Sequence, residues 1–338
     1  MTRARRALLG AALGAVAVIV AACGGQGQES GGGQGGARLT LVAYSTPQEA
    51  YKEKLIPAFQ KTPEGRGVQV DQSYGASGEQ SRAVESGLPS DVLALSLEPD
   101  ITRLEEPGLI EPGWKEDEHD GFVTRSVVVL ATRPGNPKNI KTWEDLTRPG
   151  VEVITPNPFT SGGAKWNVMA AYGSQLEQGK SEQEATQFLE RLLANVPVQD
   201  KSARESLQTF TGGKGDVLLA YENEAITAKN KGEELDYVIP DETIQIENPV
   251  AVTKESANKE KAGQFVDFLR SESGQRIFAE AGYRPVVDSV EDPKRFPEPE
   301  SLFKIGDVGG WSEVNDKFFD PEKGVFAEIN RKKGVPVD

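Results

Sequence analysis

Short apolar runs alternate with amphipathic stretches along most of the chain, and this pattern predicts strands that alternate with helices. Runs typical of buried strands lie at 39–44, 68–73, 91–97, 151–155, 196–199 and 216–221. Helical patterns cover 47–60, a stretch containing Ala83 and Val84, a segment starting at Glu98, 164–178, a helix through Phe210, a segment starting at Glu222, and 262–278. Such alternation is typical of an α/β fold with a mainly parallel sheet, whose ligands bind beyond the carboxyl ends of the strands.

The pattern occurs in two blocks, which predict two similar lobes. Extended stretches at 124–132 and 247–253 could carry the chain from one lobe to the other and back. We therefore expect lobe one to be discontinuous, with residues 37–124 and 247–338, and lobe two to contain residues 125–246. A ligand would then bind in the cleft between two hinged lobes.

The first 22 residues have the features of a signal peptide. Three arginines precede an apolar run at 7–20, and small residues lead to Cys23, the only cysteine of the chain. The apolar run is shorter than the roughly 20 residues that a membrane-spanning helix needs. We expect cleavage before Cys23, lipidation of Cys23, and a flexible Gly-, Gln- and Ser-rich tether over 23–36. The protein would then be extracytoplasmic and held at the membrane only by its lipid.

Composition excludes several classes of function. The 338 residues include 52 acidic side chains against 38 Lys and Arg, a net charge of −14, with one His and one Cys. Nucleic acids need a basic surface, so we expect no nucleic-acid partner. One His and one Cys cannot build a His-rich metal site or a disulfide within the chain. The Gly-rich segment 211–215 lacks the spacing of a phosphate-binding loop, so we expect no cofactor.

Four strand-to-helix junctions carry small residues whose backbone N–H groups could face an anion. They are Ser45-Thr46, Ser77-Gly78, Ser161-Gly162-Gly163 and Ser202-Ala203. Helix starts leave N–H groups unpaired and carry a partial positive charge. Gly162 and Gly163 also lack a Cβ, which permits close approach of the backbone to a ligand. Each junction alone can be an ordinary helix cap, but four at matching positions favour one anion site.

Two catalytic interpretations and a surface interaction module remain as alternatives. Ser161 could act as a nucleophile in a hydrolase, but the single histidine, His119, lies in a polar run typical of a solvated loop. Glu222 and Glu224 could form a carboxylate pair for glycoside chemistry. Acidic residues at a helix start more simply complement the helix dipole.

The segment 157–167, with sequence NPFTSGGAKWN, resembles the sulfate-binding proteins of ABC importers. Shorter similar segments lie at 75–78, 135–137, 153–156, 215–218, 222–225, 273–275, 283–285 and 309–311, so the likeness extends from 39 to about 326. The resemblance implies a two-lobed periplasmic-binding-protein fold, type II-like, which closes on one ligand. It also implies a binding function rather than an enzymatic one, with an ABC permease as partner and a monomeric protein.

The resemblance also assigns residues to the site. It implies that the Ser161 hydroxyl and backbone N–H groups hold an oxyanion, with the N–H donors on Ser45, Ser77, Gly162, Gly163 and Ala203. Two positions depart from the family pattern. Ser45 stands in place of an Asp, and Tyr221 stands in place of a Trp whose indole N–H binds the ligand, so the Tyr221 hydroxyl is the expected substitute donor. The implied ligand is sulfate, with thiosulfate, molybdate or phosphate as alternatives.

Overall fold

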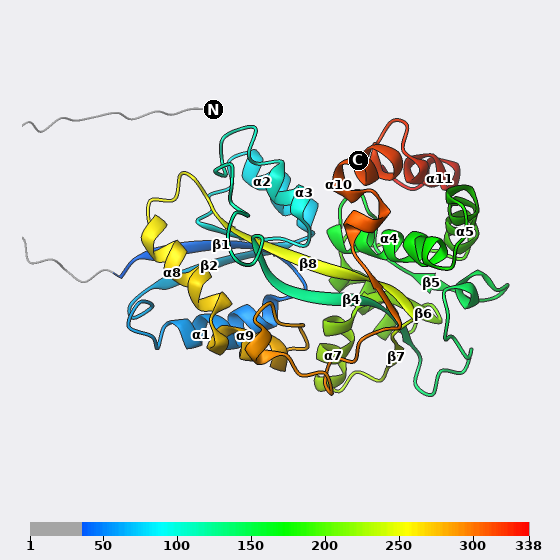
Figure 1. Ribbon diagram of the computed structural model, residues 1–338, viewed down its shortest axis with the longest axis horizontal. Helices are drawn as coiled ribbons and strands as arrows, with labels where there is room; N and C mark the ends of the chain where they lie inside the picture. The colour runs from blue at the N-terminus through cyan, green and yellow to red at the C-terminus, as the bar shows by residue number, and fades with distance from the viewer. Residues whose placement is uncertain (1–35, 338) are drawn as a thin grey trace, which may run out of the picture. The chain divides into compact units, whose positions relative to one another are not determined.

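The computed structural model describes residues 36–337, which form the α/β unit of Figure 1. The predicted signal peptide, Cys23 and nearly all of the tether lie outside these residues. The strands are β1 (Arg38–Tyr44), β2 (Gln69–Gly75), β3 (Val92–Ala94), β4 (Phe122–Thr132), β5 (Val153–Ile154), β6 (Val217–Tyr221), β7 (Asp236–Val238), β8 (Glu242–Val252) and β9 (Ser301–Phe303).

Helices follow most of these strands. The α-helices are α1 (Ile56–Phe59), α2 (Ser77–Glu85), α3 (Glu98–Thr102), α4 (Gly162–Glu177), α5 (Glu182–Ala194), α6 (Ala203–Thr211), α7 (Glu222–Asn230), α8 (Lys259–Arg270), α9 (Glu272–Glu280), α10 (Gly310–Val314) and α11 (Val325–Lys333). Short 3-10 helices are η2 (Glu144–Thr147), η3 (Asp288–Val290) and η4 (Ile305–Val308), and π-helical turns are η1 (Ala50–Leu55) and η5 (Asn315–Phe319).

The strands form a mixed sheet with the order β2-β1-β3-β8-β4-β6-β5, to which β7 and β9 add at β4 and β8. β1 pairs in parallel with β2 and β3, and β5 pairs in parallel with β6, as the strand-helix alternation predicts. The long strands β4 and β8 pair antiparallel with each other and with their neighbours β6 and β3. They run through the middle of the unit and connect two groups of elements (Figure 1), here called the β1 side (β1, β2, β3) and the β6 side (β5, β6, β7).

Alternating side chains of the strands pack on both faces of the sheet. In β1, Leu39 and Leu41 belong to one hydrophobic cluster, which includes side chains of α8 and α9, whereas Val42 belongs to a second cluster that includes Val84 of α2. In β4, Val128 and Val129 likewise contribute to different clusters. Helices therefore cover both faces of the sheet, and the expected α/β fold class is confirmed. The sheet is mixed rather than mainly parallel, because β4 and β8 pair antiparallel with their neighbours.

Three sequence predictions need correction. Residues 196–199 form no strand: Val196 N–H bonds back to Leu193 O at the end of α5, and the bonds to the neighbouring chain are made by the flanking residues, Val153 N–H to Asn195 O and Asn157 N–H to Asp200 O. The expected helix at 262–278 is two helices, since Ser271 is extended (φ −66°, ψ 158°) and caps α9. The helix expected at 47–60 contains the π-helical turn η1 immediately before Pro57, a residue that cannot donate a helical hydrogen bond.

The C-terminal segment packs with the β6 side. Phe303, Trp311, Phe318 and Phe326 share a hydrophobic cluster with Trp166 of α4 and with side chains of α5. The lobe boundaries at 124 and 247 stay a prediction, and this packing favours grouping residues 301–333 with 125–246.

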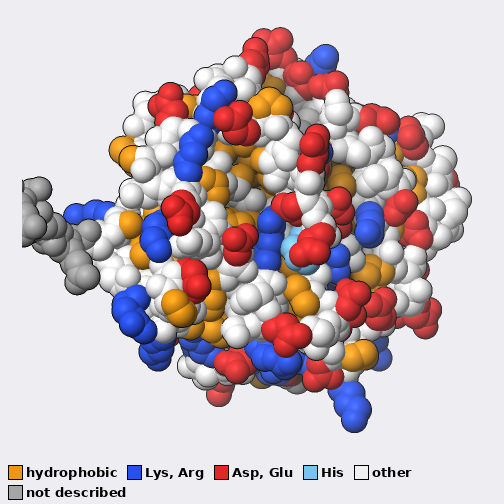
Figure 2. Space-filling model, turned by 60° about the vertical axis from the view of Figure 1, so that its left-hand side comes forward, with side chains coloured by type: hydrophobic (Ala, Val, Ile, Leu, Met, Phe, Trp, Pro, Cys, Tyr) orange, Lys and Arg blue, Asp and Glu red, His pale blue; other side chains and the backbone are white. Residues whose placement is uncertain are grey.

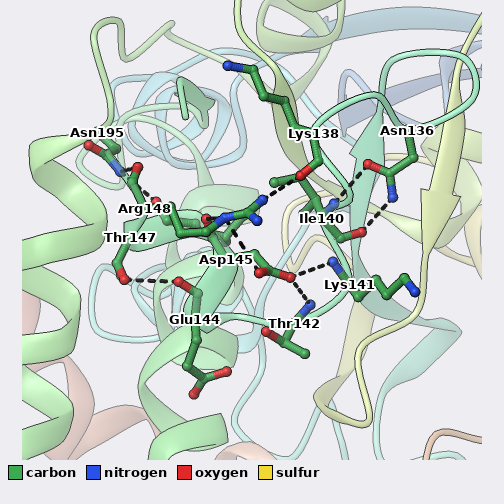
Figure 3. Close-up of polar contacts among 11 residues, drawn as sticks. Asn136, Lys138, Ile140, Lys141, Thr142, Glu144, Asp145, Thr147, Arg148 and Asn195 are labelled. Atoms are coloured by element: carbon green, nitrogen blue, oxygen red, sulfur yellow. Dashed lines mark hydrogen bonds and ion pairs between the residues drawn. The ribbon is translucent and has the colours of Figure 1, made fainter. Parts of the chain in front are cut away.

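The loop after β4 holds itself in place with a polar network (Figure 3). The Asn136 side chain bonds both backbone groups of Ile140, and the Asp145 carboxylate accepts from two successive backbone N–H groups, of Lys141 and Thr142. Asn195 donates to the carbonyls at the other end of the loop. The 135–137 motif of the resemblance is thus the start of a braced loop that leads to β5.

We predict that the buried ion pair between Glu222 and Arg284 is a major determinant of stability. Glu222 Oε2 lies 2.7 Å from Arg284 Nε, and the side chains are 0% and 10% exposed. Glu222→Ala should lower the free energy of unfolding by about 3–5 kcal/mol, because it leaves the guanidinium buried without its partner. Glu280→Ala, which removes the exposed pair with Lys54, should cost less than about 1 kcal/mol. Urea denaturation of both variants measures the difference, and equal losses would contradict this prediction.

Candidate anion-binding site

All seven ligand-binding residues expected from the sequence line one small cavity, with about 10 Å³ of space for the centre of a water molecule. It lies beyond the carboxyl ends of β1, β2 and β6, where the chain enters a helix or a turn. By this measure the space is about the least that can hold one water molecule. The cavity therefore suits a small ion or molecule.

Helix α4 presents its N-terminus to this cavity. Ser161 is its N-cap residue, and the Ser161 hydroxyl accepts a bond from Ala164 N–H at 3.4 Å. Accepting this bond leaves the hydroxyl proton available to donate. Gly162 and Gly163 occupy the first turn, where backbone N–H groups have no partner within the helix. The α4 start can thus offer one hydroxyl and two backbone donors to one ligand.

The space around residue 162 is too small for any side chain larger than that of glycine. A Cβ at this position would lie 2.6 Å from Leu97 Cδ2, 2.8 Å from Ser96 Oγ and 2.9 Å from Ser96 Cβ. The first turn of α4 therefore packs directly against the residues that follow β3.

Two further helix starts and one turn contribute to the cavity. Ser77 is the first residue of α2, and its hydroxyl donates to Asp100 Oδ2 at 2.5 Å and accepts from Ser96 N–H at 2.9 Å. Ala203 begins α6, whose cap is Ser202. Ser45 follows β1, and its carbonyl accepts from Arg204. Because the Ser77 side chain is committed to Asp100, only its backbone N–H remains for a ligand, as the resemblance implies.

Tyr221 ends β6 with its side chain fully buried. Its hydroxyl lies 2.7 Å from Ser96 Oγ, so the two hydroxyl groups share a hydrogen bond. Burial raises the pKa of the Tyr221 phenol well above its usual value, while hydrogen bonds with Ser96 and Asn248 act in the opposite direction. The phenol is therefore neutral and keeps its proton. Its expected role as the substitute ligand donor stays a prediction.

No charged side chain is among the residues that line this cavity in the described part of the chain. Two carboxyl groups lie directly behind it. Asp100 accepts from Ser77, and Glu224 accepts from the Thr46 hydroxyl at 3.2 Å and from Tyr221 N–H at 3.2 Å. Burial raises the pKa of both carboxyl groups. Their oxygens are used to position the lining residues.

Contacts between the β1 side and the helices of the β6 side close the cavity. Arg204 Nη1 and Lys231 Nζ lie 2.7 and 2.6 Å from the same oxygen of Glu49. Although burial alone would raise the pKa of Glu49, these two cations lower it to about 2. Gly78 N–H donates to Thr160 O at 3.1 Å on the opposite flank. The segments that carry the expected ligand-binding residues thus contact one another around the cavity.

Sequence analysis missed some lining residues, chiefly Ser96. Its backbone carbonyl accepts from Trp166 Nε1 and from Asn248 Nδ2, both at 2.9 Å. A signal was available, because Ser96 lies near the end of the apolar run 91–97, just before the helix expected from Glu98, at the same kind of junction as the other site residues. Thr46 and Ser202, named in the sequence only as parts of such junctions, also line the cavity.

The groups needed for the catalytic alternatives are not assembled here. His119 lies on a surface loop with its Nε2 3.4 Å from Glu118, and Figure 2 shows the one histidine beside acidic side chains. Glu222 is paired with Arg284 rather than with Glu224. In residues 36–337, no cluster of three or more His, Cys, Asp or Glu side chains is arranged to hold a metal ion. Over the same residues, no helix combines the length and apolar character needed to cross a bilayer.

Comparisons with known proteins agree on one class. Residues 39–284 match the family model of bacterial extracellular solute-binding proteins. A sulfate-binding protein of Synechococcus elongatus is 47% identical over 328 residues, covering 93% of each chain, and one of Synechocystis is 42% identical, covering 91% of this chain and 90% of the relative. The solved structure of the sulfate-binding protein SubI from Mycobacterium tuberculosis H37Rv is similar with a TM-score of 0.82 and 43% identity, covering 84% of this chain and all of that one.

The close packing around Gly162 predicts that alanine destabilises the protein at this position, whereas alanine at the unpacked Gly263 stabilises it. Gly162→Ala should lower the free energy of unfolding by about 1–3 kcal/mol, because the new methyl group overlaps Ser96. Gly263→Ala, inside α8 with no atom within 4 Å of the new methyl group, should raise it by about 0.4–1 kcal/mol. Urea denaturation measures both changes, and a Gly162→Ala variant as stable as the parent would show that α4 does not pack tightly against Ser96.

Proposed function

Because the chain belongs to the bacterial extracellular solute-binding proteins, and within them to the sulfate-binding proteins, we propose that it captures sulfate outside the cytoplasm and delivers it to an ABC importer. The observation that carries this proposal is the cavity itself, where the starts of α2, α4 and α6 meet the Ser45 turn. An oxyanion can accept bonds from all of these donors at once.

The lining also fits an anion without a counter-charge. Helix starts supply partial positive charge, and a buried site strengthens their interaction with an anion because little water screens it. A fixed Lys or Arg is therefore not required for binding. The chain's net charge of −14 does not oppose this, since the relevant field is that of the nearest dipoles.

Donor-only chemistry favours sulfate over phosphate. Near neutral pH sulfate carries no proton, whereas phosphate largely keeps one, and that proton needs an acceptor. Ser45 is the position that can weaken this preference, because its hydroxyl can accept as well as donate. Thiosulfate and molybdate also lack a proton at this pH and remain alternative ligands of the same site.

A hydrolytic role for Ser161 has no support in the site. Proteins of this family bind solutes and are not enzymes. A serine nucleophile also needs a base within hydrogen-bond reach, and the residues lining the cavity include no His, Lys, Asp or Glu.

Delivery and location complete the proposal. We propose that residues 1–22 are a signal peptide and that lipidated Cys23 holds a monomeric binding unit at the outer face of the membrane through the 23–36 tether. Two lobes, expected from the sequence at 37–124 with 247–338 and at 125–246, would open to admit the anion and close on it. The packing of residues 301–333 favours placing this segment in the second lobe. The permease is expected to recognise the closed form.

Anion selectivity tests the proposed function. Sulfate should bind about 5- to 150-fold more tightly than phosphate at pH 7, because the phosphate proton faces donors only and stays unsatisfied. Ser161→Ala should weaken sulfate binding by about 10- to 150-fold, since it removes one bond to a charged ligand. Calorimetric titration measures both effects. His119→Ala is the control with unchanged affinity, and failure of the parent protein to bind any tetrahedral oxyanion would refute the proposal.

The lipid anchor has a separate test. Cys23→Ala should release the protein from the membrane fraction without changing its sulfate affinity, because the residues proposed to bind the anion all belong to the unit that begins at Gly36. Fractionation of cells that express each form, followed by a high-salt wash, gives the readout. Retention of the Cys23→Ala variant after the wash would contradict lipid anchoring.

A further inference from the structure

Ser96 is held by hydrogen bonds to its backbone N–H, its carbonyl and its hydroxyl. Its backbone N–H donates to Ser77 of α2, and its carbonyl accepts from Trp166 of α4 and Asn248 of β8. Its hydroxyl bonds the Tyr221 hydroxyl of β6, and the residue is 1% exposed. Four elements from both sides of the cleft therefore determine where Ser96 Oγ lies.

The position of Ser96 Oγ places it at the ligand cavity. Ser96 lines the cavity together with Ser161 and Gly162. A Cβ on Gly162 would lie 2.8 Å from Ser96 Oγ, so this oxygen faces the first turn of α4, where the proposed anion donors gather. It occupies the space that a larger residue at 162 would fill.

Either oxygen of the Ser96–Tyr221 hydroxyl pair can be the donor. Ser96 Oγ is the one that lies against Gly162 in the first turn of α4. Asn248 Oδ1 accepts from the Thr124 hydroxyl at 3.1 Å, and Asn248 Nδ2 donates to Ser96 O at 2.9 Å, so Asn248 holds the Ser96 backbone in place. When Tyr221 donates to Ser96 Oγ, the Ser96 proton is free for an anion.

We propose that Ser96 Oγ donates the last hydrogen bond to the bound oxyanion, and that Tyr221 positions its proton rather than contacts the ligand, while Asn248 holds the Ser96 backbone. The chain of donors runs from the Tyr221 hydroxyl to Ser96 Oγ, and from Ser96 to an anion oxygen. Ser96 Oγ thus accepts one bond from Tyr221 and gives its own proton to the anion. This inference rests on the proposed function and names a further specificity-determining residue of that site.

Alanine at Ser96 is a clean test because the three backbone bonds of this residue do not involve its side chain. Ser96→Ala should weaken sulfate binding by about 10- to 150-fold. Tyr221→Phe should weaken it less, since Ser96 keeps a hydroxyl that can still turn to the anion. If Tyr221 were the direct donor, the order of the two losses would be reversed.

Ser126→Ala is the matched control. Ser126 is a fully buried serine of β4 whose hydroxyl has no hydrogen-bond partner among residues 36–337, and it does not line the cavity. This variant should bind sulfate like the parent. Thermal melting of the unliganded Ser96→Ala variant should show a fold as stable as that of the Ser126→Ala variant to within a few degrees.

Thiosulfate binding distinguishes the loss of one donor from a general disturbance of the cavity. The terminal sulfur of thiosulfate is a weaker acceptor than oxygen, so it can lie where the Ser96 hydrogen bond is missing at a smaller loss of affinity. The ratio of sulfate to thiosulfate affinity should therefore fall in Ser96→Ala and stay constant in Ser126→Ala.

Three results would overturn the inference: sulfate affinity of Ser96→Ala equal to that of the parent, a larger loss in Tyr221→Phe than in Ser96→Ala, or equal weakening of both anions in Ser96→Ala. With the parent still binding sulfate, these results leave the proposed function intact. A parent protein that binds no oxyanion instead refutes the proposed function and this inference with it.

Discussion

Buried backbone N–H groups need acceptors, and this requirement governs the structure around the cavity. The starts of α2, α4 and α6 bring such groups together at a place that water cannot reach freely. A helix cannot satisfy its first N–H groups internally, and a buried donor without a partner costs about 1–3 kcal/mol. An acceptor-rich ligand removes several of these costs at once. The N–H groups that destabilise the empty cavity therefore contribute to ligand affinity once an anion accepts their hydrogen bonds.

The polar side chains behind the cavity form hydrogen bonds to the residues at these helix starts and to the Ser45-Thr46 turn. Ser77 is bound to Asp100, and Thr46 is bound to Glu224. Carboxylates this near would repel a bound anion, but burial raises the pKa of both groups, which favours their neutral forms at a given pH. The acids can thus fix the lining residues with a smaller electrostatic penalty than fully charged groups would impose.

Local sequence signals predicted the positions of the strand-to-helix junctions well, because a short apolar run followed by Ser, Thr or Gly indicates both a strand end and a helix cap. Helix boundaries inside a hydrophobic pattern were less predictable. Phe265 of α8 and Phe278 of α9 pack in one hydrophobic cluster. The apolar pattern of the sequence therefore runs across Ser271, where the helix is broken, and does not reveal the break. The packing of Trp311 and Phe326 against the β6 side depends on contacts distant in sequence, which periodicity does not report.

The partners of Ser96 illustrate what sequence alone could not supply and how position 221 can carry a tyrosine. An indole N–H only donates, whereas a phenol oxygen also has lone pairs, which would face an anion unfavourably unless another donor binds them. Here the phenol is bonded to Ser96 Oγ at 2.7 Å, and Asn248 holds the Ser96 backbone. Ser96 and Asn248 come from the turn after β3 and from β8, far apart in the sequence. In the proposed arrangement, a phenol at position 221 acts through a serine that itself contacts the anion, so the site is better described as a set of directed donors than as a set of residue types.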